Sequence, residues 1–239
     1  FPLIGSIQKV IIMEQLLDLD TKLLYLVNGS HSAFVDGVMM MLTNGFTWLP
    51  LYIALFILVI KNNESMAQIM LITGCALLCI LLSDGLADFI AKPVVARWRP
   101  TSDPLIKYTI DVVDNYRPGM YGFFSAHAAN TMSLAVFLSL LVRNRIFTFA
   151  LVFWSLVNCY SRLYLGVHYP LDILTGIVCG ILVGVACFFV CRHFYFKISP
   201  RFNYISSQYS SSGYSIADID MVLTVLVMIY AVAVIFSMI

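Results

Sequence analysis

The 239-residue chain is 61% hydrophobic and only 11% charged, with a formal net charge of +1. Soluble globular domains carry about 25% charged residues, so this composition and a mean hydropathy of +0.90 exclude an ordinary water-soluble domain. The near-neutral charge does not favour a nucleic-acid partner. We expect an all-α integral membrane bundle of about six transmembrane helices, forming one domain over residues 13–239. Residues 1–12 precede Met13 and are treated as a candidate extension outside that domain.

The N-terminal segment combines leucines with regularly placed charges. From Glu14 to Asn28, leucines alternate with Asp18, Asp20 and Lys22. So many charges do not fit a membrane crossing, and the pattern predicts an amphipathic helix lying in the membrane interface. The turn Asn28-Gly29-Ser30 ends this helix.

Six apolar runs predict the transmembrane helices, at residues 38–60, 66–90, 128–142, 147–164, 173–190 and 221–238. The longest loop between them, 101–124, is polar. We expect it to cover the functional site and contact a headgroup, with a plain connector as the alternative. The segment 197–220 is rich in serine and tyrosine and predicts a mobile loop without a catalytic motif.

The cysteines show no pattern of a metal or disulfide framework. All six lie in apolar runs, without paired C-x2-C spacing, which is typical of packing residues. The sequence also lacks a carboxylate-rich cage. We therefore expect no metal and no cofactor.

One stretch concentrates polar chemistry in apolar surroundings. Arg162, His168 and Asp172 fall within residues 161–172. On a helix, His168 and Asp172 share a face, the spacing by which a carboxylate orients a histidine. Ionisable groups at membrane depth indicate function, whereas the plainer interpretation is a salt bridge that pins two helices.

Two upstream segments add to this stretch. Lys92 to Pro100 contains a lysine, six residues and Arg99-Pro100; Phe124-Ser125-Ala126-His127 follows. Lys92, Arg99 and Arg162 suit a clamp for phosphate oxygens, and Ser125 adds a donor at a helix N-terminus.

In this order, the three segments resemble the signature of the type 2 phosphatidic acid phosphatase superfamily: K-x6-RP, PSGH and SR-x5-H-x3-D. The first and third match in full, whereas Phe124 and Ala126 depart from the second. The resemblance implies that His168 attacks phosphorus, that Asp172 orients it and that His127 protonates the leaving group. It implies metal-independent hydrolysis through a phosphohistidine.

The function expected from the resemblance is hydrolysis of a phosphomonoester or pyrophosphate on a membrane lipid. The chain looks similar to bacterial lipid A and undecaprenyl diphosphate phosphatases; phosphatidylglycerol phosphate and phosphatidic acid are alternative substrates. A non-catalytic anion or lipid transporter and a catalytically lapsed, lipid-binding relative are the rival interpretations. The expected partners are the lipid substrate and the bilayer, with no obligatory protein partner.

Basic residues predict the orientation. The ends of the spans away from the motifs carry an excess of basic over acidic residues: Lys61, Arg143, Arg145, Arg192, Lys197 and Arg201 against Glu64, Asp218 and Asp220. Basic residues in short loops mark the cytoplasmic side. We therefore expect the motifs to face outward, into the periplasm of a bacterial inner membrane.

Overall fold

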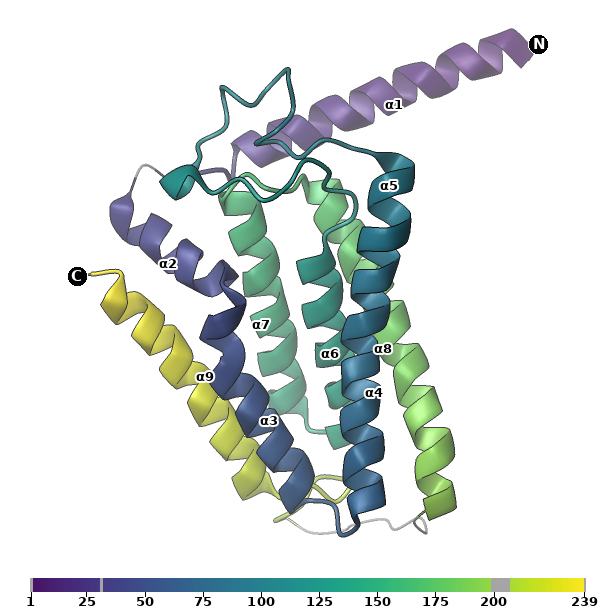
Figure 1. Ribbon diagram of the computed structural model, residues 1–239, viewed down its shortest axis with the longest axis vertical. Coiled ribbons are helices and arrows are strands. Elements are labelled where there is room, and N and C mark those ends of the chain that lie inside the picture. Colours follow the sequence, from purple (N-terminus) through teal and green to yellow (C-terminus); the bar gives the residue numbers. More distant parts are fainter. Residues whose placement is uncertain (1, 31, 199–206, 239) are drawn as a thin grey trace.

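The computed structural model describes residues 2–30, 32–198 and 207–238, and the regular elements of these residues are all helices (Figure 1). The helices are α1 (Pro2–Tyr25), α2 (Ala33–Thr43), η1 (Gly45–Trp48), α3 (Leu49–Lys61), α4 (Met66–Asp84), η2 (Gly85–Ala91), α5 (Lys92–Val95), η3 (Val113–Asn115), α6 (Ala126–Val142), α7 (Arg145–Tyr164), α8 (Pro170–Ile198) and α9 (Ile216–Phe236). The expected all-α fold is confirmed.

The predicted spans correspond to six helical units. Among the described residues, four are long and apolar enough to cross a bilayer: Met66–Val95, which joins α4, η2 and α5, and then α7, α8 and α9. The pair formed by α2 and η1–α3 makes a fifth if it counts as one span, and α6 has only 17 residues. The chain is therefore an integral membrane protein, with one broken and one short helix in its bundle.

The first span is not the continuous helix predicted over residues 38–60. It breaks at Asn44, where the chain bends by 68°. A break exposes carbonyl groups that lipid cannot satisfy. Here Thr47 Oγ1 donates to the Met41 carbonyl at 2.6 Å and Trp48 Nε1 to the Leu42 carbonyl at 2.9 Å. The side chains that follow the break thus stabilise it.

The helices α6 and α8 pack very closely. Three glycines spaced four residues apart on α8 face α6: Gly176, Gly180 and Gly184. A Cβ on Gly180 would lie 2.6 Å from the Ala129 carbonyl oxygen, and the other two glycines approach α6 backbone oxygens as closely. Small residues allow such approach between membrane helices. This packing sets the start of α6 beside the start of α8.

Helix α1 crosses one end of the bundle and projects beyond it (Figure 1). It begins at Pro2, earlier than the Glu14 start expected from the sequence. Between residues 11 and 25, only Asp20 and Leu24 are buried, whereas leucines such as Leu16 and Leu19 are exposed. A helix across the bundle end with exposed apolar side chains fits the predicted interfacial location.

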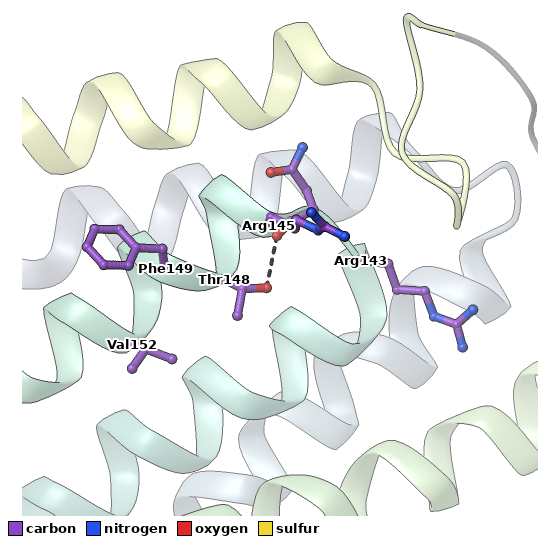
Figure 2. A pocket seen from close by; sticks show the side chains of 6 residues that line it. Arg143, Arg145, Thr148, Phe149 and Val152 are labelled. Atoms are coloured by element: carbon purple, nitrogen blue, oxygen red, sulfur yellow. Dashed lines mark hydrogen bonds between the residues drawn. The ribbon is translucent and has the colours of Figure 1, made fainter.

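The opposite end of the bundle is basic. A shallow hollow there is lined by Arg143, Asn144, Arg145, Thr148, Phe149 and Val152 (Figure 2). Both arginines are exposed, and the Thr148 hydroxyl donates to the Asn144 carbonyl at 2.9 Å. Lys61, at the same end, pairs with Asp218. Arg201, which belongs to the predicted basic set, lies outside the described residues.

Candidate active site

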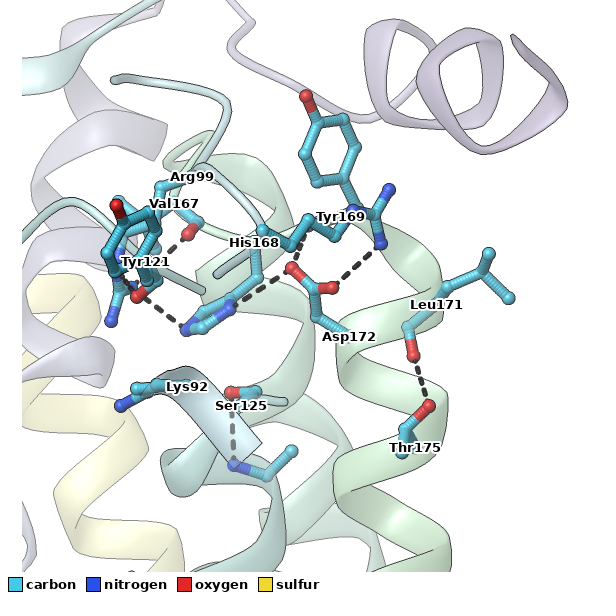
Figure 3. Close-up of polar contacts among 12 residues, drawn as sticks. Lys92, Arg99, Tyr121, Ser125, Val167, His168, Tyr169, Leu171, Asp172 and Thr175 are labelled. Carbon is cyan, nitrogen blue, oxygen red and sulfur yellow. Dashed lines mark hydrogen bonds and ion pairs between the residues drawn. The ribbon is translucent and has the colours of Figure 1, made fainter. Parts of the chain in front are cut away.

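His168 and Asp172 form a buried pair at the end of the bundle that α1 crosses (Figure 3). His168 lies in the turn before α8 and Asp172 in the first turn of α8, with 1% and 0% of their surfaces exposed. The His168 Nδ1 atom is 3.6 Å from Asp172 Oδ2. This is longer than a hydrogen bond, as catalytic contacts often are before substrate binds.

Arg99 contacts the other ring nitrogen of His168. Its Nη1 lies 3.0 Å from Nε2 and 3.3 Å from the Val167 carbonyl oxygen. A guanidinium cannot accept a hydrogen bond, so Nε2 must be the acceptor. In the neutral ring, the proton then sits on Nδ1 and faces Asp172. The lone pair of Nε2 is thus available as the nucleophile that the sequence analysis predicts.

Burial and the surrounding charges keep His168 neutral. Burial is the main cause that holds the pKa of His168 well below its ordinary value of 6.5, followed by Arg99, Arg162, Lys92 and His127. All three predicted phosphate-binding cations therefore lie close enough to act on this ring. Burial and the charge of Arg162 also lower the pKa of Arg99 to about 10, which leaves it charged at neutral pH.

Arg162 reaches the site from α7 with a buried donor that has no partner. Its Nη1 donates to the Thr43 hydroxyl at 2.7 Å and to the Tyr116 hydroxyl at 2.9 Å. Its Nε group is buried and has no hydrogen-bond partner. A buried unpaired donor is rare in native structures. Here it suits an anionic oxygen that arrives with a ligand.

Lys92 lies at the start of α5 and pairs with Asp88, one turn earlier. The neighbouring Asp84 accepts a hydrogen bond from Asn130 at 2.7 Å instead.

Ser125 and His127 open α6. The Ser125 side chain, fully buried, caps the helix by accepting from Ala128 N at 3.4 Å, and its backbone N–H donates to the Asp172 carbonyl at 3.1 Å. His127 is exposed, and its imidazole makes no hydrogen bond within the described part of the chain. The positive helix N-terminus thus adds to the cations around the pair.

The second half of the loop 101–124 lies against the pair. Trp98 and Tyr121 form a short antiparallel bridge, in which Arg99 N donates to the Met120 carbonyl at 2.8 Å. A Cβ on Gly122 would lie 3.2 Å from Asp172 Oδ2 and 3.4 Å from His168 Nδ1. The loop thus packs beside the site, and its contact with a headgroup stays a prediction.

The sequence interpretation missed Arg97 and Asp20. Arg97 donates from Nη1 to Asp172 Oδ1 at 2.8 Å and from Nη2 to Asp20 Oδ2 at 2.6 Å. The first-motif pattern counts only Lys92 and Arg99 among the cations of its segment. A third basic residue in an otherwise apolar segment was the available signal.

No cluster suited to a metal ion occurs in the described ranges: they hold no group of three or more histidine, cysteine, aspartate or glutamate side chains so arranged. The six cysteines are free thiols, five of them buried and Cys179 half-buried.

The fold and site define an integral membrane protein with a buried histidine–aspartate pair among converging cations. Residues 73–197 match the family model described as the PAP2 superfamily, and the chain belongs to this superfamily. The family resemblance read from the three motifs is thereby confirmed.

Similar proteins include two curated relatives. The chain is 35% identical over 181 residues to the lipid A 4'-phosphatase of Bacteroides thetaiotaomicron, covering 75% of this chain and 80% of the relative. It is 31% identical over 160 residues to the undecaprenyl-diphosphatase BcrC of Bacillus subtilis, covering 66% of this chain and 76% of the relative. The crystal structure of Aquifex aeolicus LpxE shares the fold, with a TM-score of 0.53 at 23% identity over 71% of this chain and 94% of that one.

Proposed function

We propose that the chain hydrolyses a phosphomonoester or pyrophosphate of a membrane lipid at the outward membrane face, with lipid A phosphate or undecaprenyl diphosphate as the substrate. The observation that carries the proposal is the His168 ring, held neutral with its Nε2 lone pair directed at Arg99. Relatives named for phosphatases of both lipids support these two substrates.

The reaction begins at Nε2 of His168. Its lone pair forms the N–P bond while the bond from phosphorus to the leaving oxygen breaks. Positive charge develops on the imidazole, and Asp172 stabilises it through the Nδ1 proton. His127 protonates the leaving oxygen, and the negative charge of the bound phosphate favours the protonated form of His127.

Water completes the cycle. His127, now neutral, takes a proton from water as its oxygen attacks phosphorus, and the N–P bond returns its electron pair to Nε2. This step releases inorganic phosphate; the lipid product of the first step is an alcohol or, from a pyrophosphate, a lipid monophosphate. Lys92, Arg99, Arg162 and the N-terminus of α6, capped by Ser125, stabilise the charge on the phosphate oxygens.

The substrate class follows from where the site lies. The histidine pair sits at the end of an apolar bundle, beside the helix α1 whose exposed leucines suit the interface. A lipid can present its phosphate there while its chains stay in the bilayer, and each buried methylene contributes about 0.8 kcal/mol to binding. Phosphatidylglycerol phosphate and phosphatidic acid are the alternative substrates.

The orientation is part of the proposal. Arg143, Arg145, Arg192 and Lys197 belong to the end opposite the site. Because basic residues stay on the cytoplasmic side, the site faces outward, to the periplasm of a bacterial inner membrane. A transporter, the rival from another class, would need charges along successive spans, whereas the described site gathers them at one end.

The test is phosphate release by the purified protein from a panel of lipid A, undecaprenyl diphosphate, phosphatidylglycerol phosphate and phosphatidic acid, with EDTA present. We expect release to survive the chelator, to stop with vanadate, and to be fastest on one of the first two lipids. A water-soluble analogue with the same phosphate group should show a much lower kcat/KM. Equal efficiency on analogue and lipid, or strict magnesium dependence, would overturn the proposal.

A further inference from the structure

Asp20 is a buried carboxylate in a helix otherwise largely exposed. Only 2% of its surface is accessible, whereas Asp18 on the same helix has a side chain 62% exposed and pairs with Lys22. Asp20 Oδ1 accepts from the Leu171 backbone N–H at 2.9 Å, and Oδ2 accepts from Arg97 at 2.6 Å. A buried charge is costly unless it is fully paired, and these contacts pair both oxygens.

Arg97 carries this contact to the catalytic pair. One arm of its guanidinium binds Asp20 and the other binds Asp172 Oδ1 at 2.8 Å. The plane of Arg97 lies over the Tyr169 ring, 4.0 Å from its centre, and its side chain is 17% exposed. An arginine that stacks on an aromatic ring and binds a different carboxylate through each of its two terminal nitrogens has little freedom to move.

Asp172 is consequently held through both oxygens. Arg97 binds Oδ1, and the Tyr169 backbone N–H donates to Oδ2 at 3.1 Å. The second oxygen is also the one that faces His168 Nδ1 at 3.6 Å (Figure 3). A rotation of the carboxylate that released Oδ1 would turn Oδ2 away from the imidazole.

We propose that Asp20 and Arg97 are positioning residues of the phosphatase, which fix the Asp172 carboxylate against His168 and tie α1 to the reacting site. This inference rests on the proposed function. Neither residue touches the substrate in this role. Both act through Asp172, and α1 becomes part of the catalytic unit rather than a membrane anchor alone.

The charge of Asp20 has a second effect. Arg97 alone would neutralise Asp172 and weaken its support for the imidazolium of the phosphohistidine. Two carboxylates around one guanidinium leave a net negative charge beside His168. Asp20 thus offsets the charge of Arg97, so that Arg97 orients Asp172 without cancelling it.

The test compares Asp20→Asn with Asp18→Asn, a control on the same helix. We expect Asp20→Asn to lower kcat roughly 10- to 100-fold, as for partners that orient a functional histidine through a carboxylate, with little change in KM. Asp18→Asn should keep wild-type rates. Because Asp20 acts through Arg97, the double variant Asp20→Asn/Arg97→Gln should be no slower than Arg97→Gln alone.

A second readout does not depend on turnover. In ¹⁵N NMR spectra of the resting protein, the two ring nitrogens of His168 should give separate signals, protonated Nδ1 and unprotonated Nε2. In Asp20→Asn these signals should move toward each other as the other tautomer becomes populated, and in Asp18→Asn they should not move.

Two results would overturn the inference: an unchanged kcat in Asp20→Asn, or a loss of activity that follows loss of folded protein while the His168 signals stay in place. If the wild type releases phosphate from no lipid, the proposed function fails, and the His168 signals still decide the role of Asp20.

Discussion

Arg99 Nη1 donates a hydrogen bond to His168 Nε2 at 3.0 Å, so the atom proposed to attack phosphorus is already occupied in the resting site. A bound phosphate offers Arg99 stronger acceptors, because charged pairs form the stronger hydrogen bonds. Transfer of the guanidinium to the phosphate frees the Nε2 lone pair. In the proposed mechanism, substrate binding would thereby both neutralise the cation and release the nucleophile.

Substitution of the two site histidines should impair different steps of the reaction. His168→Ala should abolish turnover and the trapped phosphoenzyme, because no other side chain supplies the attacking nitrogen. His127→Ala should slow release of the lipid by roughly 10²- to 10⁴-fold, the usual range for general acid catalysis. Rapid-quench trapping of phosphoenzyme and steady-state rates distinguish the variants. His193→Ala, exposed near the far end of α8, is the matched control. Normal phosphoenzyme in His168→Ala would refute the assignment.

His168 should resist protonation. Burial and the surrounding cations hold its pKa well below 6.5, so its ¹⁵N signals should not titrate between pH 7 and about 5.5. Arg99→Ala removes the largest charge contribution and should raise this pKa. An unfolded chain takes up this proton near pH 6.5, so the free energy of unfolding should fall as the pH drops below that value. A titration midpoint at or above 6.5 in the resting wild type would contradict the expectation.

The glycine contact between α6 and α8 should set stability. Gly180→Ala places a Cβ 2.6 Å from the Ala129 carbonyl oxygen and should destabilise the protein by about 1–3 kcal/mol, the usual cost of overpacking. Gly74→Ala, on α4, meets no atom within 4 Å and should leave stability equal or higher, since alanine favours helix. Thermal unfolding in one detergent measures both. If Gly180→Ala melted at the same temperature as the wild type, α6 and α8 would have to shift apart at no cost, which would contradict this prediction.

Membrane orientation can be tested with single cysteines. In a background without the six native cysteines, Leu105→Cys lies in the loop on the site side, 89% exposed, and Ser211→Cys is exposed at the opposite end. An impermeant maleimide should label only Leu105→Cys in intact cells and both after permeabilisation. Ser210 would be a poor choice, because it is only 6% exposed. Labelling of both positions in intact cells would show that a span has been miscounted.

Periodic and local features of this protein were readable from sequence. Long apolar runs predicted the helices of the bundle, because a bilayer imposes their length and composition. The end of α8 was predicted too early, at Val190 instead of Ile198. The 68° bend was missed because Asn44 and Gly45 interrupt a hydropathic run only briefly. Its stability depends on Thr47 and Trp48 reaching back to specific carbonyls, which hydropathy does not report.

The sequence predicted those parts of the site whose residues lie close together along the chain. His168 and Asp172 are one helical turn apart, and spacing alone paired them. Asp20 and Arg97 meet only in the folded chain, 77 residues apart. Asp20 has the same character in sequence as Asp18, and only packing buries the first and exposes the second. Such a distinction comes from tertiary structure.

The length of α6 has a consequence for depth. Seventeen residues span about 25 Å, less than the roughly 30 Å of bilayer hydrocarbon. If the far end of α6 lies at one hydrocarbon boundary, its start, with Ser125 and His127, would lie just inside the other boundary. The phosphate of the proposed lipid substrate would then reach these residues by a small movement within its own leaflet.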